Sequence, residues 1–346
     1  MGDEKYILGI DTSNYKTSVA VLNGRSIISD LRRLLDVKAG EKGLRQSDAV
    51  FQHMKNLPEL FEELMSDFDG EISAISYASR PRPVSGSYMP CFLSGETFAR
   101  SIGTFLQVPV IGFSHQEGHI EAIRAFSEMK YLEKYLACHF SGGTCEILKI
   151  VPASTDRRRT VIEGYSTFSG ENTFYDIELV GGTKDISFGQ VLDRAGVMMG
   201  FPFPCGNKMD AIACSSGKTS GMLTPIKVFD GKVNLSGIDT QIKNKLTSLT
   251  RGISPAALET QLRDELIREI MTKISDAISE LLIQTSQTTG LNDVIMSGGV
   301  STSRFIRREI SEKLEEKGII VYFDDMDLSS DNAVGIALLG GEYIWD

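Results

Sequence analysis

Two of the four histidines stand four residues apart, in His115-Gln116-Glu117-Gly118-His119. Positions i and i+4 of a helix share one face, so both imidazoles can reach a single metal ion; the alternative is an unliganded pair on a helix surface. The H-E-x-x-H pattern of zinc proteases does not fit, because Glu117 lies about 200° round the helix from His115. The spacing therefore indicates a metal pair and disfavours a protease.

Two further residues could complete such a metal site. Asp331 precedes an apolar stretch predicted to be a helix, where it is either a metal ligand or only the helix N-cap. His139 lies in an otherwise apolar predicted strand, where it is either a histidine satisfied within the core or a further ligand. The remaining histidine, His53, is interpreted as an ordinary surface or core residue.

Three turns of small residues follow predicted strands, at Asp11-Thr12-Ser13, Ser141-Gly142-Gly143 and Ser297-Gly298-Gly299. Backbone N–H groups in such turns can approach a phosphate closely, because little or no side chain intervenes. One glycine turn is weak evidence, but three at strand ends in a repeated layout predict a nucleotide held between two lobes. Ser216-Gly217-Lys218-Thr219 only resembles the end of a phosphate loop, since position 212 is Ile where that loop needs glycine.

The predicted elements around these residues repeat. The chain opens with a strand over Tyr6–Asp11 and a hairpin turning at Asn23-Gly24, and a similar unit follows Tyr135. Its strands are expected over Leu136–Phe140, Thr144–Val151 and Thr160–Tyr165, and a long amphipathic helix is expected from a cap at Ser254-Pro255 to about Gly290. Two halves that begin alike and mix strands with helices predict a duplicated α/β fold.

The composition sets limits on the class of protein. A chain of 346 residues with 41% hydrophobic and 24% charged residues has room for two globular domains. Its net charge of −10 provides no overall attraction to nucleic acid or membranes, so RNA contact would need a local basic patch or a basic partner. The five cysteines include no C-x-x-C pair, and no signal peptide or spanning segment is recognised, so a cytoplasmic location is expected.

Two basic clusters are candidates for such a patch, Arg157-Arg158-Arg159 and the group Arg304, Arg307 and Arg308. Each is either a solvated face or a contact for tRNA or phosphate.

Together these motifs resemble the catalytic subunits of threonylcarbamoyladenosine synthase, the TsaD family, over nearly the whole chain and in the family's order. Besides the H-x-E-G-H element, which is highly specific, the resemblance is carried by Gly9-Ile10-Asp11-Thr12-Ser13, Ser141-Gly142-Gly143, Phe188-Gly189-Gln190-Val191-Leu192-Asp193, Gly200-Phe201-Pro202-Phe203-Pro204-Cys205-Gly206, Ser297-Gly298-Gly299-Val300 and Asp331-Asn332-Ala333.

The resemblance implies the actin-like, sugar-kinase and chaperone ATPase fold, an α/β fold with two RNase H-like lobes around a nucleotide cleft. The first lobe would span 1–133, completed by a C-terminal helix over 331–346, and the second 134–330. The reaction would be acyl transfer, in which a threonylcarbamoyl adenylate donates its acyl group to a tRNA adenosine. The tRNA would be reached through partner proteins, either TsaB/TsaE-like accessory proteins or a second copy in a homodimer, without a membrane.

The resemblance also implies roles for site residues. A divalent metal, iron or zinc, would be held by His115, His119 and Asp331, with His139 as a further ligand. Asp11 would be a catalytic polar group near the metal or the phosphates. An adenine nucleotide or acyl adenylate would be lined by Ser141, Gly142, Gly143, Gly206, Gly298 and Gly299, with Asp193 and Asp210 facing the ribose.

This chain departs from the family at three places. Asn14-Tyr15-Lys16-Thr17 stands where the family usually has an acidic pair, Lys208 replaces a ribose-facing glutamate, and Ser303 replaces an asparagine on the adenine side. Losing each polar contact could cost about 1 to 3 kcal/mol if the ligand were unchanged. We therefore expect a divergent paralogue that uses another acyl donor or acceptor.

Two alternatives remain open at this point. One is a non-catalytic, nucleotide-binding regulatory or scaffold protein. The other is a small-molecule kinase of the same fold, with Asp11 in phosphoryl transfer. The retained His115, His119 and Asp331 argue against both, because neither needs this metal triad.

Overall fold

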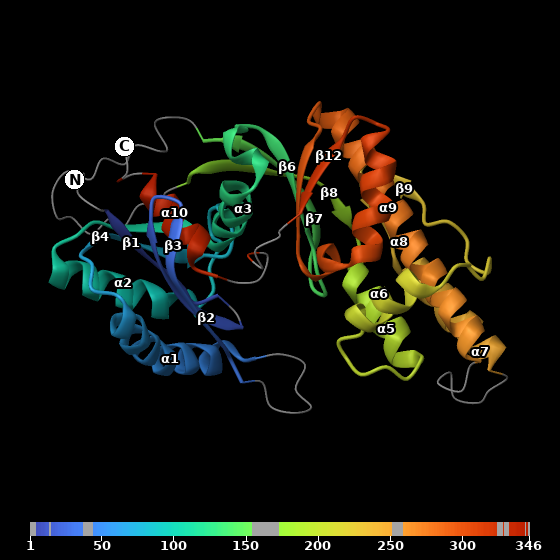
Figure 1. Ribbon diagram of the computed structural model, residues 1–346, viewed down its shortest axis with the longest axis horizontal. Coiled ribbons are helices and arrows are strands. Elements are labelled where there is room, and N and C mark those ends of the chain that lie inside the picture. Colours follow the sequence, from blue (N-terminus) through green and yellow to red (C-terminus); the bar gives the residue numbers. More distant parts are fainter. Residues whose placement is uncertain are drawn as a thin grey trace. The chain divides into compact units, whose positions relative to one another are not determined.

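The computed structural model describes residues 5–13, 15–36, 44–153, 173–250, 259–323, 328, 332–342 and 344. The chain divides into two compact units. Unit 1 comprises Met1–Glu133, Val151–Ile177 and Asp325–Asp346, and unit 2 comprises Lys134–Ile150 and Glu178–Asp324. Each unit has one mixed sheet with helices packed against it, which makes the chain an α/β protein (Figure 1).

One segment differs from the expected division into lobes, because Val151–Ile177 groups with unit 1 rather than with the second lobe. The backbone N–H groups of Phe174 and Tyr175 donate to Glu117, which lies in a helix of unit 1. The Tyr175 hydroxyl donates to Glu121 of the same helix. These long-range hydrogen bonds could not be foreseen from local sequence pattern.

The sheet of unit 1 has the strand order β3-β2-β1-β4-β5. β1 pairs with β2, and β2 with β3, in antiparallel fashion, whereas β4 is parallel to both β1 and β5. The hairpin turn lies at Gly24-Arg25, one residue later than expected, and Gly24 takes the positive φ of +56°. The strands are β1 (Tyr6–Asp11), β2 (Lys16–Asn23), β3 (Ser26–Leu34), β4 (Ile72–Arg80) and β5 (Val110–Ser114).

Helices cover both faces of this sheet (Figure 1). α1 (Gln46–Asp67) and α2 (Phe92–Leu106) pack on the face that carries Ile10 and Val19. α3 (His115–Phe126) and α10 (Val334–Gly341) lie on the face that carries Ile7 and Ala20, and the short helix η1 (Glu128–Tyr131) follows α3. Alternation of apolar side chains along the strands gives each face its own core, because successive residues point to opposite sides.

His53 belongs to the interior of unit 1, on the side of α1 that faces the sheet. It is fully buried, and its Nδ1 lies 2.9 Å from the hydroxyl of Thr17. Burial lowers the pKa of His53 to about 4, so the ring is neutral at physiological pH. The structure thus decides between surface and core in favour of the core.

The sheet of unit 2 has the order β12-β11-β6-β7-β8-β10-β9. Five of its strands repeat the arrangement of unit 1: β6 and β7 form the antiparallel pair, β8 lies beyond β7, and β11 and β12 continue in parallel on the other side. The expected duplication is therefore confirmed. The strands are β6 (Tyr135–Phe140), β7 (Cys145–Pro152), β8 (Tyr175–Thr183), β9 (Val228–Phe229), β10 (Lys232–Val233), β11 (Asp293–Ser297) and β12 (Ile320–Phe323).

Two expectations for unit 2 need comment. The third strand is β8, whereas the strand expected over Thr160–Tyr165 lies outside the described residues. The long helix α8 begins at Thr260, beyond the expected cap at Ser254-Pro255, which also lies outside the described residues, and it ends at Gly290 as expected. The helices are α5 (Phe188–Met198), α6 (Gly206–Ser215), α7 (Ser236–Leu249), α8 (Thr260–Thr289), α9 (Arg304–Glu315) and the short η3 (Gly299–Thr302).

In the described part of the chain, no helix is both long and apolar enough to cross a lipid bilayer.

The contact between α3 and α10 is unusually close because glycines face each other. A Cβ atom on Gly335 would lie 1.8 Å from the carbonyl oxygen of Gly118, and one on Gly118 would lie 2.8 Å from Ile336 Cδ1. Gly335 is therefore required by packing against the backbone of α3, whereas a Cβ atom on Gly118 would first meet the buried side chain of Ile336. The hydroxyl of Ser76 on β4 donates a hydrogen bond to the carbonyl oxygen of Ile336 at 2.7 Å, which holds α10 against the sheet.

We expect Gly335→Ala to lower the free energy of unfolding by about 1 to 3 kcal/mol, because the added methyl group forces α10 away from α3. Urea denaturation would measure the loss. Gly237→Ala is the matched control, since its added Cβ meets open space in α7 and a helical alanine is favoured by up to about 1 kcal/mol. Equal stability of Gly335→Ala and wild type would contradict this account of the helix contact.

Candidate metal and nucleotide sites

The paired histidines lie at one edge of the sheet in unit 1. Because β1, β4 and β5 are parallel, their carboxyl ends meet at that edge, with Asp11 ending β1 and Ser114 ending β5 directly before α3. His115 and His119 occupy the first and fifth positions of α3. The expected helical i, i+4 arrangement is present, and it is brought beside Asp11 by the parallel strands.

Asp11 holds the ring of His115 in a defined orientation. Its Oδ2 lies 2.6 Å from His115 Nδ1, and its Oδ1 accepts a hydrogen bond from the backbone N–H of Ser13 at 2.7 Å. The carboxylate is buried, so it is screened little by solvent. A carboxylate at Nδ1 favours the tautomer in which Nε2 presents its lone pair, the arrangement typical of metal-ligating histidines.

The two Nε2 atoms of His115 and His119 lie 2.9 Å apart. This is the distance of a hydrogen bond between the N–H of one ring and the lone pair of the other, and it brings both donor atoms to one point. Imidazole nitrogens are ligands that suit divalent ions of borderline softness, and two of them at about 2.1 Å from a tetrahedral ion lie about 3.4 Å apart, so a small rotation of the rings would let both bind one ion. Within the described residues, no group of three or more His, Cys, Asp or Glu side chains is arranged to hold an ion, but the expected third ligand, Asp331, lies outside them.

The N-terminus of α10 has a cap of its own. Asn332 Oδ1 accepts hydrogen bonds from the backbone N–H groups of Val334 at 3.0 Å and Gly335 at 3.4 Å. These are two of the N–H groups that an N-cap would satisfy. Asn332 therefore satisfies these two groups, while Asp331 lies outside the described residues and its role, metal ligand or N-cap, stays a prediction.

Glu117, the acidic residue of the motif, fastens α3 in place. It forms a capping box with Ser114, and its Oε1 accepts hydrogen bonds from the backbone of Phe174 and Tyr175. Burial raises the pKa of Glu117, while these hydrogen bonds oppose the shift. Its carboxylate is thus occupied by structural hydrogen bonds, and the cap could have been recognised from the S-x-x-E spacing.

Sequence reasoning missed Arg80 as a residue of this edge. It ends β4, between the ends of β1 and β5, and is 7% exposed, with Nη1 donating to the Ser79 hydroxyl. The available signal was the segment from Arg80 to Ser87, rich in proline, glycine and serine, which is typical of a loop. Lys16 begins β2, the strand that pairs with β1, and Tyr15, directly before it, is exposed.

A second candidate site lies in unit 2, where two of the three predicted turns meet. β6 and β11 are parallel neighbours, with Ser297 opposite His139, so the turns that follow them lie at the same edge of the sheet. His139 Nδ1 is 3.1 Å from the Ser297 hydroxyl, and its role as a ligand stays a prediction. The Ser141 hydroxyl accepts hydrogen bonds from Gly143 and Thr144, which shapes the first turn.

The glycines of this edge fall into two kinds. A Cβ atom at Gly142, Gly143, Gly206 or Gly299 would meet no other atom within 4 Å, so their backbone faces open space. Gly298, with φ +90°, would instead bring a Cβ atom to 2.5 Å from the carbonyl oxygen of Phe140. Gly298 is required by the turn itself, and the four open glycines are those that a phosphate could approach.

The aspartates expected to face a ribose also act as helix caps. Asp193 Oδ1 accepts from the backbone N–H of Cys205 at 2.8 Å, just before α6. Asp210 Oδ1 accepts from Phe305 N–H at 2.9 Å and from the Ser303 hydroxyl, at the start of α9. These contacts place both carboxylates beside the open glycines and tie α5, α6 and α9 together.

The departures at Lys208 and Ser303 have different surroundings. Lys208 is exposed on the first turn of α6. Ser303 is the N-cap of α9, and its hydroxyl accepts from Ile306 N–H at 3.1 Å. Serine and asparagine are equally strong N-cap residues, so Ser303 keeps the cap and the cap does not explain the substitution.

Of the two basic clusters, only the second lies within the described residues. Arg157-Arg158-Arg159 lies outside the described residues. Of the second cluster, Arg304 and Arg308 are exposed, while Arg307 donates to the Ser301 carbonyl at 2.6 Å and lies over the Phe323 ring. One arginine of that cluster therefore serves the packing of α9.

The fold is shared with solved structures of low sequence identity. Component A of (R)-2-hydroxyglutaryl-CoA dehydratase from Acidaminococcus fermentans superimposes with a TM-score of 0.54 at 14% identity, covering 96% of each chain. Full-length HypF gives a TM-score of 0.54 at 16% identity, covering all of this chain and 48% of HypF. These similarities establish the actin-like, sugar-kinase ATPase fold that the resemblance implied.

Sequence comparison is more specific. A tRNA N6-adenosine threonylcarbamoyltransferase of Thermodesulfovibrio yellowstonii is 28% identical over 342 residues, covering 96% of this chain and 93% of its own length. One from Thermosipho melanesiensis is 24% identical, with 96% and 93% covered. The model of the TsaD family, tRNA N6-adenosine threonylcarbamoyltransferase, matches residues 36–161 and 166–338. With most of its length matched by that model, and with the histidine pair and glycine turns in the family's order, this chain belongs to the TsaD family as a divergent member.

Proposed function

We propose that this protein is a metal- and adenine-nucleotide-dependent carbamoyl-type transferase whose chemistry resembles threonylcarbamoyl transfer to a tRNA adenosine. The observation that carries the proposal is the pair of Nε2 atoms 2.9 Å apart with Asp11 behind His115. A kinase or a scaffold of this fold has no need of such a pair, whereas an acyl transferase can use a Lewis acid.

In this proposal an iron or zinc ion is held by His115 and His119, with Asp331 and His139 as the further ligands that the family resemblance implies. When bound, the ion would orient the oxygens of the acyl donor and polarise its carbonyl. Asp11, expected as a catalytic polar group, keeps the proton on His115 Nδ1 and so directs Nε2 to the ion. Its burial preserves that orientation.

The nucleotide half of the donor would lie against the open glycines of unit 2. Gly142, Gly143 and Gly299 leave room for their backbone to approach phosphate, with Ser141 shaping the turn and Gly298 holding its partner turn. Gly206, Asp193 and Asp210 would line the ribose. Fixed N–H dipoles stabilise developing negative charge at no cost of reorganisation.

The acceptor is the part of the proposal in which this chain differs from its relatives. Tyr15 and Lys16 put a phenol and a cation where the family usually has acidic residues, which favours a changed donor or acceptor. A tRNA would be reached through a basic partner, an accessory protein or a second copy of the chain, because the net charge is −10. We place the reaction in the cytoplasm.

The first test is metal content. We expect the purified protein to carry close to one equivalent of iron or zinc, and the double variant His115→Ala, His119→Ala to lose it, as measured by plasma mass spectrometry. Asp11→Asn should weaken binding by about 10- to 100-fold, since it no longer fixes the ring of His115. His53→Gln, at a buried histidine of the same unit, is the control that keeps the metal. If the double variant keeps its metal content, the proposed metal site is wrong.

The second test is stabilisation by nucleotide. An adenine nucleotide at a hundredfold excess over its dissociation constant should stabilise the fold by about 2.7 kcal/mol, and Gly299→Val should abolish the shift by filling the open space. Gly298 is unsuitable for this purpose, because its substitution disturbs the turn itself. Gly217→Val, at another glycine facing open space, is the control. Equal thermal shifts in wild type and Gly299→Val would refute the placement of the nucleotide at the open glycines of unit 2.

The third test concerns the acceptor. We expect the gene not to restore threonylcarbamoyladenosine in a cell that lacks its standard synthase, as judged by mass spectrometry of tRNA nucleosides. The Thermodesulfovibrio yellowstonii relative is the positive control. Tyr15→Asp with Lys16→Glu should recover part of the activity, since Lys208 and Ser303 also differ. Full restoration by the unmodified gene would show that these positions are tolerated and that the ordinary tRNA reaction stands.

A further inference from the structure

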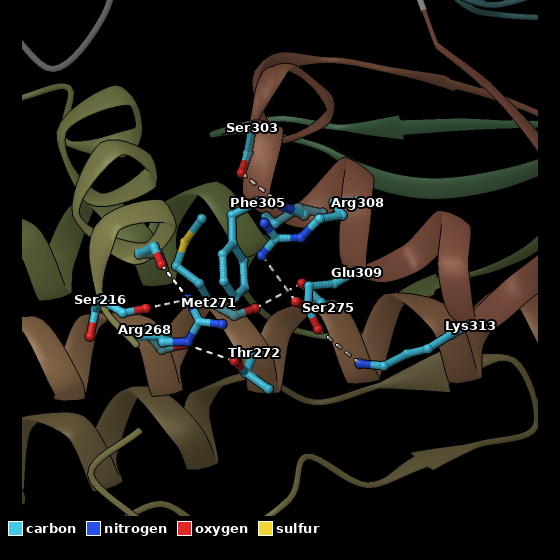
Figure 2. Close-up of polar contacts among 12 residues, drawn as sticks. Ser216, Arg268, Met271, Thr272, Ser275, Ser303, Phe305, Arg308, Glu309 and Lys313 are labelled. Atoms are coloured by element: carbon cyan, nitrogen blue, oxygen red, sulfur yellow. Dashed lines mark hydrogen bonds and ion pairs between the residues drawn. The ribbon is translucent and has the colours of Figure 1, made fainter. Parts of the chain in front are cut away.

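Arg268, in the first third of α8, contacts the end of one helix and the start of another. Its Nη1 donates to the carbonyl oxygens of Ala213 and Ser216, both at 2.6 Å, where α6 ends. Its guanidinium carbon lies 5.0 Å from the centre of the Phe305 ring on α9. Figure 2 shows the Phe305 ring next to this guanidinium and to that of Arg308.

The backbone of Phe305 links α9 to α6 and so completes a closed path of contacts among α6, α8 and α9. Its side chain is fully buried, and its N–H donates to Asp210 on α6. The path thus runs from α6 through Asp210 to α9, through the Phe305 ring to Arg268, and through two carbonyls back to α6. Arg268 is the one residue of this path that belongs to α8, the longest helix in the described part of unit 2.

The contacts of Arg268 need the chemistry of arginine in particular. A cation at a helix C-terminus interacts favourably with the last carbonyls and the helix dipole. The planar guanidinium can donate to carbonyls at its edge while its face lies on an aromatic ring, which a lysine ammonium cannot do. Arg308, in comparison, is exposed, and within the described residues its guanidinium pairs with its neighbour Glu309.

We propose that Arg268 is a positioning residue of the nucleotide site, acting by setting the place of α6 against α9. α6 carries Gly206 and Asp210, and the turn before α9 carries Gly299 and Ser303, so a change in the spacing of the two helices changes the site. The inference rests on the proposed nucleotide binding. Arg268 itself does not touch the nucleotide.

The test is titration of ADP by calorimetry with the full chain. Arg268→Lys keeps the positive charge but loses the planar guanidinium with its several N–H donors, and should raise the dissociation constant of ADP by about tenfold. Arg308→Lys is the matched control on the same ring and should change it by less than about twofold. In Arg268→Ala, added methylguanidinium should restore ADP binding, a recovery that general destabilisation would not show. Arg268→Gln, a milder change, replaces the lysine variant if that variant does not fold.

Hydrogen exchange gives a readout without ligand. The backbone amides of the last turn of α6 should exchange faster in Arg268→Lys and at the wild-type rate in Arg308→Lys. If wild type does not bind ADP, the proposed nucleotide site is wrong and this inference falls with it. If wild type binds ADP and the folded Arg268 variant binds it equally well, the positioning role alone is overturned.

Discussion

What unit 1 can do depends on where α3 lies, and the place of α3 is set by a backbone contact that only glycine permits. Gly118 and Gly335 allow α3 and α10 to approach until main-chain atoms touch. Ser114 and Glu117 then fix the first turn of α3 at the end of β5. With both constraints in place, the two histidines face one point and His115 reaches Asp11. A larger residue at Gly335 would meet the carbonyl oxygen of Gly118 and so move α3, and the two histidines with it.

The carboxylates of the candidate sites act as anchors, and those of Asp11 and Glu117 are buried. Asp11 orients the imidazole of His115, and Glu117 accepts a hydrogen bond from the backbone N–H of Phe174, just before β8. Asp193 and Asp210 accept backbone hydrogen bonds at the starts of α6 and α9. Each accepts a backbone or ring N–H, and a buried acceptor without such a partner would be costly. The same hydrogen bonds that stabilise the fold therefore also aim the groups proposed for chemistry. For that reason acidic residues of this site cannot be assigned to stability or function alone.

The structure also shows the surroundings of the residues at which this chain departs from the family. Ser303 caps α9 and reaches Asp210, so it keeps a polar link between α6 and α9 where the family has an amide. Lys208 is exposed and free to meet a ligand of different charge. Tyr15 lies directly before β2, which begins at Lys16 beside the end of β1. The divergence thus lies at the edges that carry the proposed sites, while Gly118, which packs behind one of them, belongs to the histidine motif.

The amino-acid sequence by itself determined the elements and the local geometry. Periods of two and 3.6 predicted the strands and α8, the spacing of His115 and His119 predicted a pair on one helical face, and the turns predicted close backbone approach. These are properties of neighbouring residues. The tertiary structure decided which distant groups meet: Asp11 with His115, 104 positions apart, and Asp210 with Ser303, 93 apart. It also separated open glycines from packed ones, because the space around a backbone atom depends on elements that no local pattern describes.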